Sequence, residues 1–431
     1  MKIEGNKKMA KVKVSEDNPS LQRILEKCID CGQCLETCKS KNRLAEEDCI
    51  NCGQCIMTCP MGALVPKYNY KEVLANIHDE EKITVVSISP AVRVAIGDEF
   101  GFPAGAFLEN KLVGVLKTLG FDYVFDTTYG ADLTIMEEAT ELLSRIKKEE
   151  NLPMFTSCCP SWVLYMEKYH PEDLSHLSTC KSPIGMQGAI IKNYFAKMKN
   201  LNPSDIVTVS LAPCVSKKGE IKEDCNNDYV ITTSELAMMI REQEIDFKAC
   251  KEEDFDSILG KGSGAGVIFG TSGGVMEAAL RTAYFLLNGH DAPEDFLHLE
   301  SIRGSLSIKE AIIDLGVKTI KVAVLYGIEN VNKMYNMLKE YQFIEVMTCP
   351  TGCIGGGGQP VLPIPKIAST IDARSKSLYE NDAKLSLRNS YENAEIKKLY
   401  ENCLEKPLSK KAEELLHQRY RDKSSDIVVT K

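Results

Sequence analysis

Two stretches of the sequence place cysteines at a spacing that suits an inorganic cluster. CIDCGQCLETCK begins at Cys28, and CINCGQCIMTCP begins 21 residues later, at Cys49. Each follows the pattern C-x2-C-x2-C-x3-C, in which three thiolates bind one iron–sulfur cubane and the fourth is directed to the companion cubane. The predicted ligand sets are Cys28, Cys31, Cys34 and Cys59 for one 4Fe–4S cluster, and Cys38, Cys49, Cys52 and Cys55 for the other.

A pair of zinc sites is the alternative explanation for this block, because C-x2-C knuckles also bind zinc. A zinc knuckle uses only two such cysteines, so the third and fourth cysteine of each stretch would be redundant. We therefore favour a ferredoxin-like electron relay with two 4Fe–4S clusters.

A second group of cysteines is spread along the chain, and each member follows an apolar run. The three segments are TSCCPSW (156–162), PCVSKKGE (213–220) and EVMTCPTGCIGGGGQP (345–360). Loops that follow parallel strands meet outside the carboxyl edge of the sheet, so we expect these thiolates to converge in one buried crevice and hold a metal cluster. The glycine run would let the backbone approach a bulky inorganic group closely.

Alternating strands and helices must position these loops, and the sequence predicts them between residues 82 and 360. This alternation favours an α/β architecture with mostly parallel sheet. The predicted strands are Ile83–Ile88, Asp122–Phe125, Pro153–Thr156, Ile206–Leu211, Gly266–Phe269, Ile320–Leu325 and Phe343–Val346, and the predicted helices include Asp132–Glu149, Thr233–Glu242 and Gly274–Leu287.

Composition bounds the class of protein. The chain has 431 residues, 52 basic and 61 acidic side chains, and 17 cysteines. The net charge of −9 argues against a nucleic-acid partner. The apolar runs are too short to span a membrane, and the charged N-terminus lacks the apolar core of a signal peptide. We expect a cytoplasmic protein, in which clustered cysteines bind metal rather than each other.

The three cysteine segments resemble the signature segments of the iron-only (FeFe) hydrogenases. SISPAVRVAIGDEF (87–100), DLTIMEEATELLSRI (132–146) and FGTSGGVMEAALR (269–281) are similar to the same family, and residues 390–420 are similar to its small-subunit tail. The resemblance runs from about residue 21 to 420. It implies a small ferredoxin-like α+β domain with a linker (21–81), a large α/β catalytic domain with parallel sheets (82–383) and a helical small-subunit-like tail (384–431). The polar residues 1–20 are predicted from their composition to form a mobile arm.

The resemblance also implies a cofactor and the residues that hold it, the H-cluster. Its 4Fe–4S part would be bound by Cys159, Cys214, Cys349 and Cys353. Cys353 would also bridge to a two-iron centre with CO, cyanide and azadithiolate ligands. Cys158 would donate a proton to the azadithiolate amine, Lys217 would hydrogen-bond a cyanide, and Met347 would pack beside the two irons. Further predicted cofactor contacts are Ser89, Pro90 and Ser216.

A proton path is predicted on the helix after Asp132. Glu138, Glu141 and Arg145 share one helix face. From spacing alone, a solvated face with an acid–base pair is the simpler explanation. The family's proton path nevertheless matches this chain residue by residue, in the order Cys158, Glu138, Ser178, Glu141 and Arg145.

Some positions depart from the usual family pattern. Ala212 stands where Met is common, Ile184 where Gln is frequent, and Ala91 where Ser is common. They indicate a divergent subgroup and leave the catalytic bias and turnover open. The other cysteines, Cys180, Cys225, Cys250 and Cys403, are interpreted as structural thiols, with Cys180 close to the predicted proton path.

The expected activity is reversible oxidation of H2 and reduction of protons. Electrons would be exchanged with ferredoxin or flavodoxin through the two accessory clusters, and hydrogenase maturation proteins would supply the two-iron centre. An iron–sulfur assembly protein without that centre is a second hypothesis, although such a relative would not be expected to keep Cys158, Lys217 and the Glu138–Glu141 pair together. A hydrogen sensor is a third.

Overall fold

The computed structural model describes residues 11–40, 49–222, 226–257, 259–293, 296–301 and 307–426. Half of the predicted N-terminal arm and the predicted structural thiol Cys225 lie outside the described residues. In the part of the chain that the structure describes, no helix combines the length and the apolar composition that a membrane crossing requires.

The N-terminal region is built around its cysteines. Strand β1 (Leu21–Arg23) pairs antiparallel with β2 (Leu64–Pro66), and helices α1 (Gln33–Ser40) and α2 (Gln54–Thr58) lie between them in the chain. Few apolar side chains are available here, and cysteines from both stretches fill the core beside Val12, Leu21, Ile56 and Leu64. So small a region gains little from apolar burial alone, which is why small domains commonly depend on metals or disulfides.

A four-stranded parallel sheet follows, in the order β4 (Tyr123–Asp126), β3 (Ile83–Ile88), β6 (Ile206–Ala212) and β7 (Tyr229–Thr232). Both faces are covered by helices, as a parallel sheet requires. Val86 and Ile88 face α3 (Tyr70–Ile77), α5 (Glu109–Leu119) and α11 (Thr233–Glu242). Val85, on the other face, packs with α8 (Pro183–Ile190).

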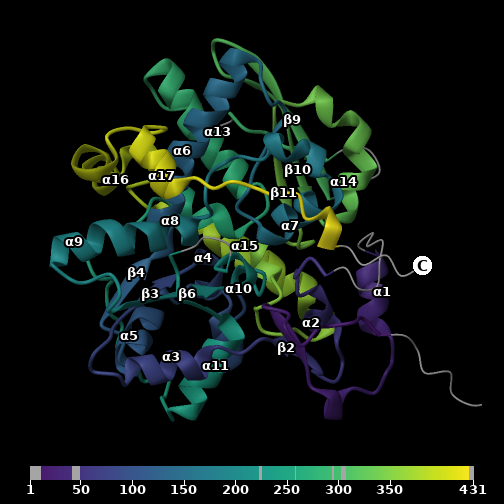
Figure 1. The fold of residues 1–431 in the computed structure, drawn as a ribbon, viewed down its shortest axis with the longest axis vertical. Coiled ribbons are helices and arrows are strands. Elements are labelled where there is room, and N and C mark those ends of the chain that lie inside the picture. The colour runs from purple at the N-terminus through teal and green to yellow at the C-terminus, as the bar shows by residue number, and fades with distance from the viewer. Residues whose placement is uncertain are drawn as a thin grey trace, which may run out of the picture.

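The second sheet has five strands and is mixed. Its order is β5 (Met154–Phe155), β11 (Phe343–Met347), β10 (Thr319–Tyr326), β9 (Ile308–Asp314) and β8 (Glu300–Ser301). The first three are parallel to one another. Strand β9 pairs antiparallel with β10, and β8 pairs antiparallel with β9. Figure 1 shows this sheet in the upper part of the view and the first sheet in the lower part. The mixed α/β architecture with parallel sheets is thereby confirmed.

A long helix joins the two sheets. Helix α6 (Thr127–Lys148) packs Ile135 and Leu142 into the core of the second sheet, together with α13 (Gly274–Asn288). Its Tyr129 and Leu133 face the core beside the first sheet. The helix begins five residues before the predicted Asp132, because Asp126 caps it by accepting a hydrogen bond from the Thr128 N–H.

One predicted strand is wrong. Gly266–Phe269 lies in helix α12 (Gly264–Val267) and the 3₁₀ turn that follows it, and Ser263 caps this helix through the Gly266 N–H. A Cβ at Gly262 or Gly266 would lie 2.2 or 2.7 Å from backbone atoms of Thr128. The glycines therefore permit close packing on α6, and a strand there would not place them against that helix.

The C-terminal tail is helical but broken. Helix α15 (Ile367–Lys384) ends where the predicted tail begins, and α16 (Ala394–Leu399) and α17 (Lys410–Leu416) follow as separate short elements. After α17 the chain crosses the molecule to reach α7 (Pro160–Tyr169), as the yellow segment of Figure 1 shows. There Lys423 forms an ion pair with Glu167 at 2.7 Å.

Candidate active site

The three cysteine segments converge on one cavity between the two sheets. Residues of all three segments line it. Strands β3, β5, β6 and β11 all deliver residues to it from their carboxyl ends. The predicted site residues that line it are Ser89, Pro90, Cys158, Cys159, Cys214, Lys217, Met347, Cys349 and Cys353. Ser216 does not line this cavity and lies instead on a groove outside it.

The walls of the cavity are apolar where the sequence departs from the family pattern. Ala91, Ile184 and Ala212 all line it. Ile184 and Ala212 pack together with Val230 in a small core cluster. The three departures therefore lie in the wall of one cavity and reduce the polar and bulky groups available there.

Burial dominates the electrostatics of the thiols. It raises the pKa of Cys214 to about 12, and it raises the pKa of Cys349 and Cys353 above the ordinary range as well, with the neighbouring thiols adding repulsion. Thiolates so crowded and so poorly solvated need cations beside them. The donor set, four cysteines in one buried cavity, therefore fits an iron–sulfur cluster.

The buried cation beside the cavity is Lys217, on α10 (Lys217–Glu220). Its ammonium donates to the Cys158 carbonyl at 3.0 Å and pairs with Glu220 at 2.6 Å. Burial works to lower the pKa of Lys217, but Glu220 outweighs it and the pKa is raised. Ser182 also donates to Glu220, so that carboxylate is held in place. The site therefore keeps a fixed positive charge next to Cys158.

The glycine run also permits close packing within the protein. A Cβ on Gly356 would lie 2.5 Å from the Pro213 carbonyl oxygen, and a Cβ on Gly357 would lie 2.7 Å from the Cα of Gly53. These contacts are with protein backbone. The run lets the Cys353 loop pack closely against the segment that carries Cys214 and against the N-terminal region.

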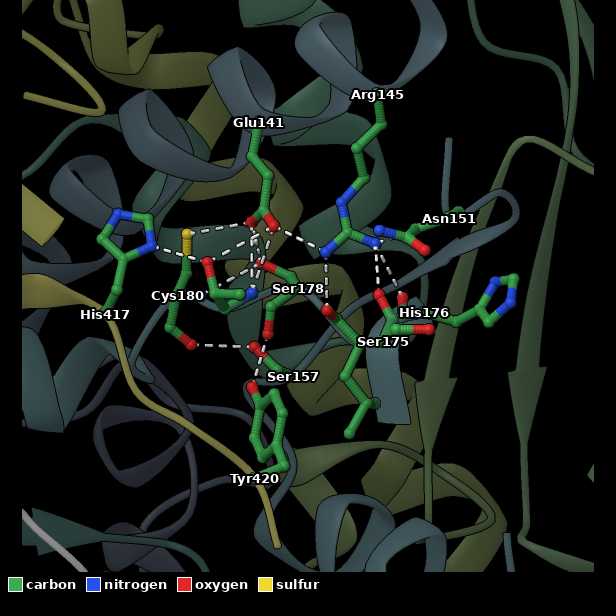
Figure 2. Close-up of polar contacts among 12 residues, drawn as sticks. Glu141, Arg145, Asn151, Ser157, Ser175, His176, Ser178, Cys180, His417 and Tyr420 are labelled. Atoms are coloured by element: carbon green, nitrogen blue, oxygen red, sulfur yellow. Dashed lines mark hydrogen bonds and ion pairs between the residues drawn. The ribbon is translucent and has the colours of Figure 1, made fainter. Parts of the chain in front are cut away.

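The predicted proton path is brought together in part by direct bonds. The Ser178 hydroxyl donates to Glu141 Oε2 at 2.8 Å, and the Arg145 guanidinium donates to Glu141 Oε1 at 2.7 Å (Figure 2). Glu138 is buried, and one of its oxygens has no hydrogen-bond partner among the described residues. Burial, followed by repulsion from Glu141 and Glu345, raises the pKa of Glu138 to about 8. Glu138 also contributes to raising the pKa of the Cys158 thiol, after burial.

The surroundings of Glu141 were predicted only in part: Cys180 was expected close to the proton path, whereas Thr179 and His417 were missed. Cys180, interpreted as a structural thiol, places its Sγ 3.7 Å from Glu141 Oε2. The Thr179 hydroxyl lies 3.3 Å from Glu141 Oε1 and 2.7 Å from His417 Nδ1. Thr179 and His417 are 238 positions apart, so no local spacing signals their contact. The ion pair between Lys217 and Glu220, by contrast, follows a local i, i+3 helical spacing.

The eight N-terminal cysteines line two separate recesses. Cys28, Cys31, Cys34 and Cys59 line one, together with Arg23. The other recess is lined by Cys38, Cys49, Cys52 and Cys55. Each recess thus gathers three cysteines of one stretch and one cysteine of the other, in the same groups as the two predicted ligand sets.

The recess lined by Cys38, Cys49, Cys52 and Cys55 adjoins the active-site cavity. The Gln54 side-chain amide donates to Cys349 Sγ at 3.2 Å. Gly53 lies against Gly357, and a Cβ on Gly53 would also clash with Val215 at 2.5 Å. The second cysteine stretch and the cavity are therefore in direct contact through α2 and the loops beside it.

Comparison with known proteins places these features in a family. Residues 82–357 match the model of the iron-only hydrogenase large subunit, C-terminal domain, and residues 368–423 match the iron hydrogenase small subunit. Residues 25–41 and 44–65 match 4Fe–4S binding domains. A 4Fe–4S region thus precedes a hydrogenase-type domain and a small-subunit-type tail.

Similar proteins cover most of the chain. The NADP-reducing hydrogenase subunit HndD of Solidesulfovibrio fructosivorans is 39% identical over 91% of this chain, which spans 66% of that relative's length. Iron hydrogenase 1 of Clostridium pasteurianum is also 39% identical, over 95% of this chain and 77% of the relative. A solved variant of the [FeFe]-hydrogenase HydA1 from Chlamydomonas reinhardtii has a TM-score of 0.74 and 38% identity, covering 82% of this chain and 99% of the other.

A more distant relative is named as a cluster assembly factor and not as a hydrogenase. The cytosolic Fe-S cluster assembly factor narfl of Danio rerio is 30% identical over 79% of this chain and 87% of the relative. Its identity to this chain is lower than that of the hydrogenases, and the match to the large-subunit domain alone covers 276 of 431 residues. The chain belongs to the iron-only hydrogenase family.

Proposed function

We propose that the chain is an active hydrogenase that interconverts H2 with protons and electrons at a cluster held by Cys159, Cys214, Cys349 and Cys353. The observation that carries the proposal is the meeting of three things at one buried cavity. These are four thiols for a cluster, a free thiol beside a fixed ammonium, and a chain of buried carboxyls leading away.

The residues of the chain have distinct tasks in this reaction. When bound, the cluster and its two-iron centre supply the redox and hydride-accepting chemistry. Lys217 keeps a positive charge at the cavity wall and holds the backbone of Cys158. Cys158 carries a proton on its Sγ between the cavity and Glu138. Glu138, with a pKa of about 8, gains and loses that proton near neutral pH, as an efficient acid–base group must.

Electrons take a separate route. The recess that contains Cys28 and Cys31, both partly exposed, would hold the entry cluster. The recess that contains Cys49 and Cys52 would hold the second cluster. The contact between Gln54 and Cys349 then links that second cluster to the cavity. A ferredoxin or flavodoxin docked near Cys28 is the proposed partner, in a cytoplasmic setting where hydrogenase maturation proteins supply the two-iron centre.

A cluster assembly role is the second candidate, since the family has a relative named as an assembly factor. An assembly protein has no need of a relay thiol, a fixed ammonium and a buried carboxyl path. This chain has Cys158, Lys217 paired to Glu220, and Glu138 in these places.

Infrared spectroscopy of the matured protein separates the two candidates. We expect bands from metal-bound CO and cyanide, together with H2 evolution from reduced ferredoxin. In the same preparation, Cys158→Ala should keep the bands and lose most of its H2 exchange, by about 100-fold or more. Intact 4Fe–4S signals without the CO and cyanide bands would refute the hydrogenase proposal and favour assembly.

A further inference from the structure

Arg145 is placed to hold Glu141 rather than to carry protons onward. Its guanidinium donates to the backbone oxygens of Asn151, Ser175, His176 and Leu177 and to Glu141, at 2.7 to 3.3 Å (Figure 2). A guanidinium keeps its protons in proteins. A proton that reaches Glu141 therefore needs another acceptor.

The chain provides another acceptor, His417, which Glu141 reaches through the hydroxyl of Thr179. Glu141 Oε1 faces the Thr179 hydroxyl at 3.3 Å, and that hydroxyl lies 2.7 Å from His417 Nδ1. A hydroxyl can accept one hydrogen bond and donate another. Imidazole is the side chain that ordinarily gains and loses a proton near neutral pH. Figure 2 shows His417 beside Cys180 and Glu141, at the side of the carboxylate opposite Arg145.

His417 is held in place by backbone pairing. The Lys181 N–H donates to the Leu416 carbonyl, and the Gln418 N–H donates to the Thr179 carbonyl, both at 2.8 Å. His417 and Cys180 thus face each other in an antiparallel bridge. The other ring nitrogen, Nε2, lies 3.2 Å from Glu137, a buried carboxylate that also accepts from Tyr400.

We infer that His417 carries the proton beyond Glu141, through the hydroxyl of Thr179; the inference rests on the proposed hydrogenase function. During H2 oxidation, protonated Glu141 gives its proton to Thr179 Oγ as the Thr179 hydroxyl gives its own proton to His417 Nδ1. Glu141 is left as a carboxylate, and the imidazolium then releases one proton to water. Proton reduction uses the same steps in reverse, and no electrons move.

Direct release from Glu141 to water is the competing route. The Glu141 side chain keeps 10% of its surface exposed, and that of His417 keeps 8%. Both Glu141 oxygens, however, are already occupied by donors from Ser178, Thr179, Cys180 and Arg145. Water has to compete with these donors, whereas Thr179 is already in contact with Glu141 and with the next acceptor.

Thr179 offers a matched pair of variants in the matured enzyme. Thr179→Val keeps the shape of the side chain and removes the hydroxyl, whereas Thr179→Ser keeps the hydroxyl. We expect H2 evolution to fall about tenfold or more in T179V and to stay within about twofold of wild type in T179S. The infrared bands should remain unchanged in both. Equal turnover in T179V and wild type would show that the proton does not pass through this hydroxyl.

His417 is tested by chemical rescue. His417→Ala should lose turnover with its infrared bands intact. Added imidazole should raise the turnover of this variant several-fold. Failure of imidazole to act on H417A, or recovery of the same size in Glu138→Gln, would overturn the role of His417. If matured wild-type protein lacks CO and cyanide bands, the proposed function itself fails and this inference falls with it.

Discussion

At the scale of a single residue, Glu138 has the properties that a proton carrier requires. It is buried, one of its oxygens lacks a hydrogen-bond partner among the described residues, and its pKa is raised to about 8. Ser178 and Arg145 lower that pKa, but burial and the repulsion from Glu141 and Glu345 outweigh them. A structural carboxylate would be expected to have its donors satisfied, as Asp132 does with Ser263, Ser390 and Asn393.

The prediction at this scale is a loss of turnover in Glu138→Gln. The amide has the same size but cannot take up a proton, so H2 evolution should fall by about 100-fold or more. Infrared bands from the cofactor should be unchanged, because Glu138 does not line the cavity. Glu150→Gln, in the exposed turn just after α6, is the matched control and should keep wild-type turnover. Turnover of E138Q near that of the control would exclude Glu138 from the path.

At the scale of elements, strand ends and close backbone packing assemble the site. The sequence predicted the fold class, and six of its seven predicted strands are present in the structure, because apolar runs and strand-end loops are local signals. It also predicted the grouping of the eight cysteines, which the 21-residue repeat contains. It missed β7, the short strands β1, β2 and β8, and β9, whose outward-facing positions are partly polar. It also missed the contact between Thr179 and His417 and the way both reach Glu141. Those contacts depend on where the tail folds back, which no local pattern encodes.

Gly357 gives an element-scale prediction. In Gly357→Ala the new Cβ would lie within 2.7 to 2.8 Å of the backbone of Gly53, and rigid backbone cannot move aside at low cost. Overpacking of this kind costs about 1 to 3 kcal/mol. We expect a lower thermal midpoint and slower electron entry from the proposed ferredoxin partner. Gly219→Ala is the control, because its Cβ would meet nothing closer than 3.4 Å. Equal midpoints for the two variants would contradict the role of this contact.

At the scale of the whole molecule, the two sheets and the tail meet around α6. Among the buried carboxyls in this centre, three have a raised pKa: Asp132, Glu138 and Glu345. Asp132 binds the tail through Ser390 and Asn393, and Glu345 accepts from the N–H groups of Gly273 and Met276 at the start of α13. Burial is the largest cause of a raised pKa in all three, to about 6, 8 and 7 in that order.

These raised pKa values make stability depend on pH in a definite direction. The ordinary values are 3.8 for Asp132 and 4.5 for the two glutamates. The folded state therefore binds more protons than the unfolded state between the ordinary and the raised value of each group. The resulting stabilisation is complete below about pH 4 and is lost as pH rises through 6, 7 and 8.

The cluster-loaded protein should accordingly unfold at lower urea concentration at pH 8 than at pH 6, as followed by circular dichroism. The loss attributable to Glu138 should be roughly 1 kcal/mol per pH unit in this interval. Glu138→Gln removes the titrating group, so its urea midpoint should fall less steeply between pH 7 and pH 8. Glu414→Gln, an exposed position on α17, should keep the wild-type slope. A slope unchanged in E138Q, or a stability that rises toward pH 8, would mean that Glu138 is already ionised in the folded molecule.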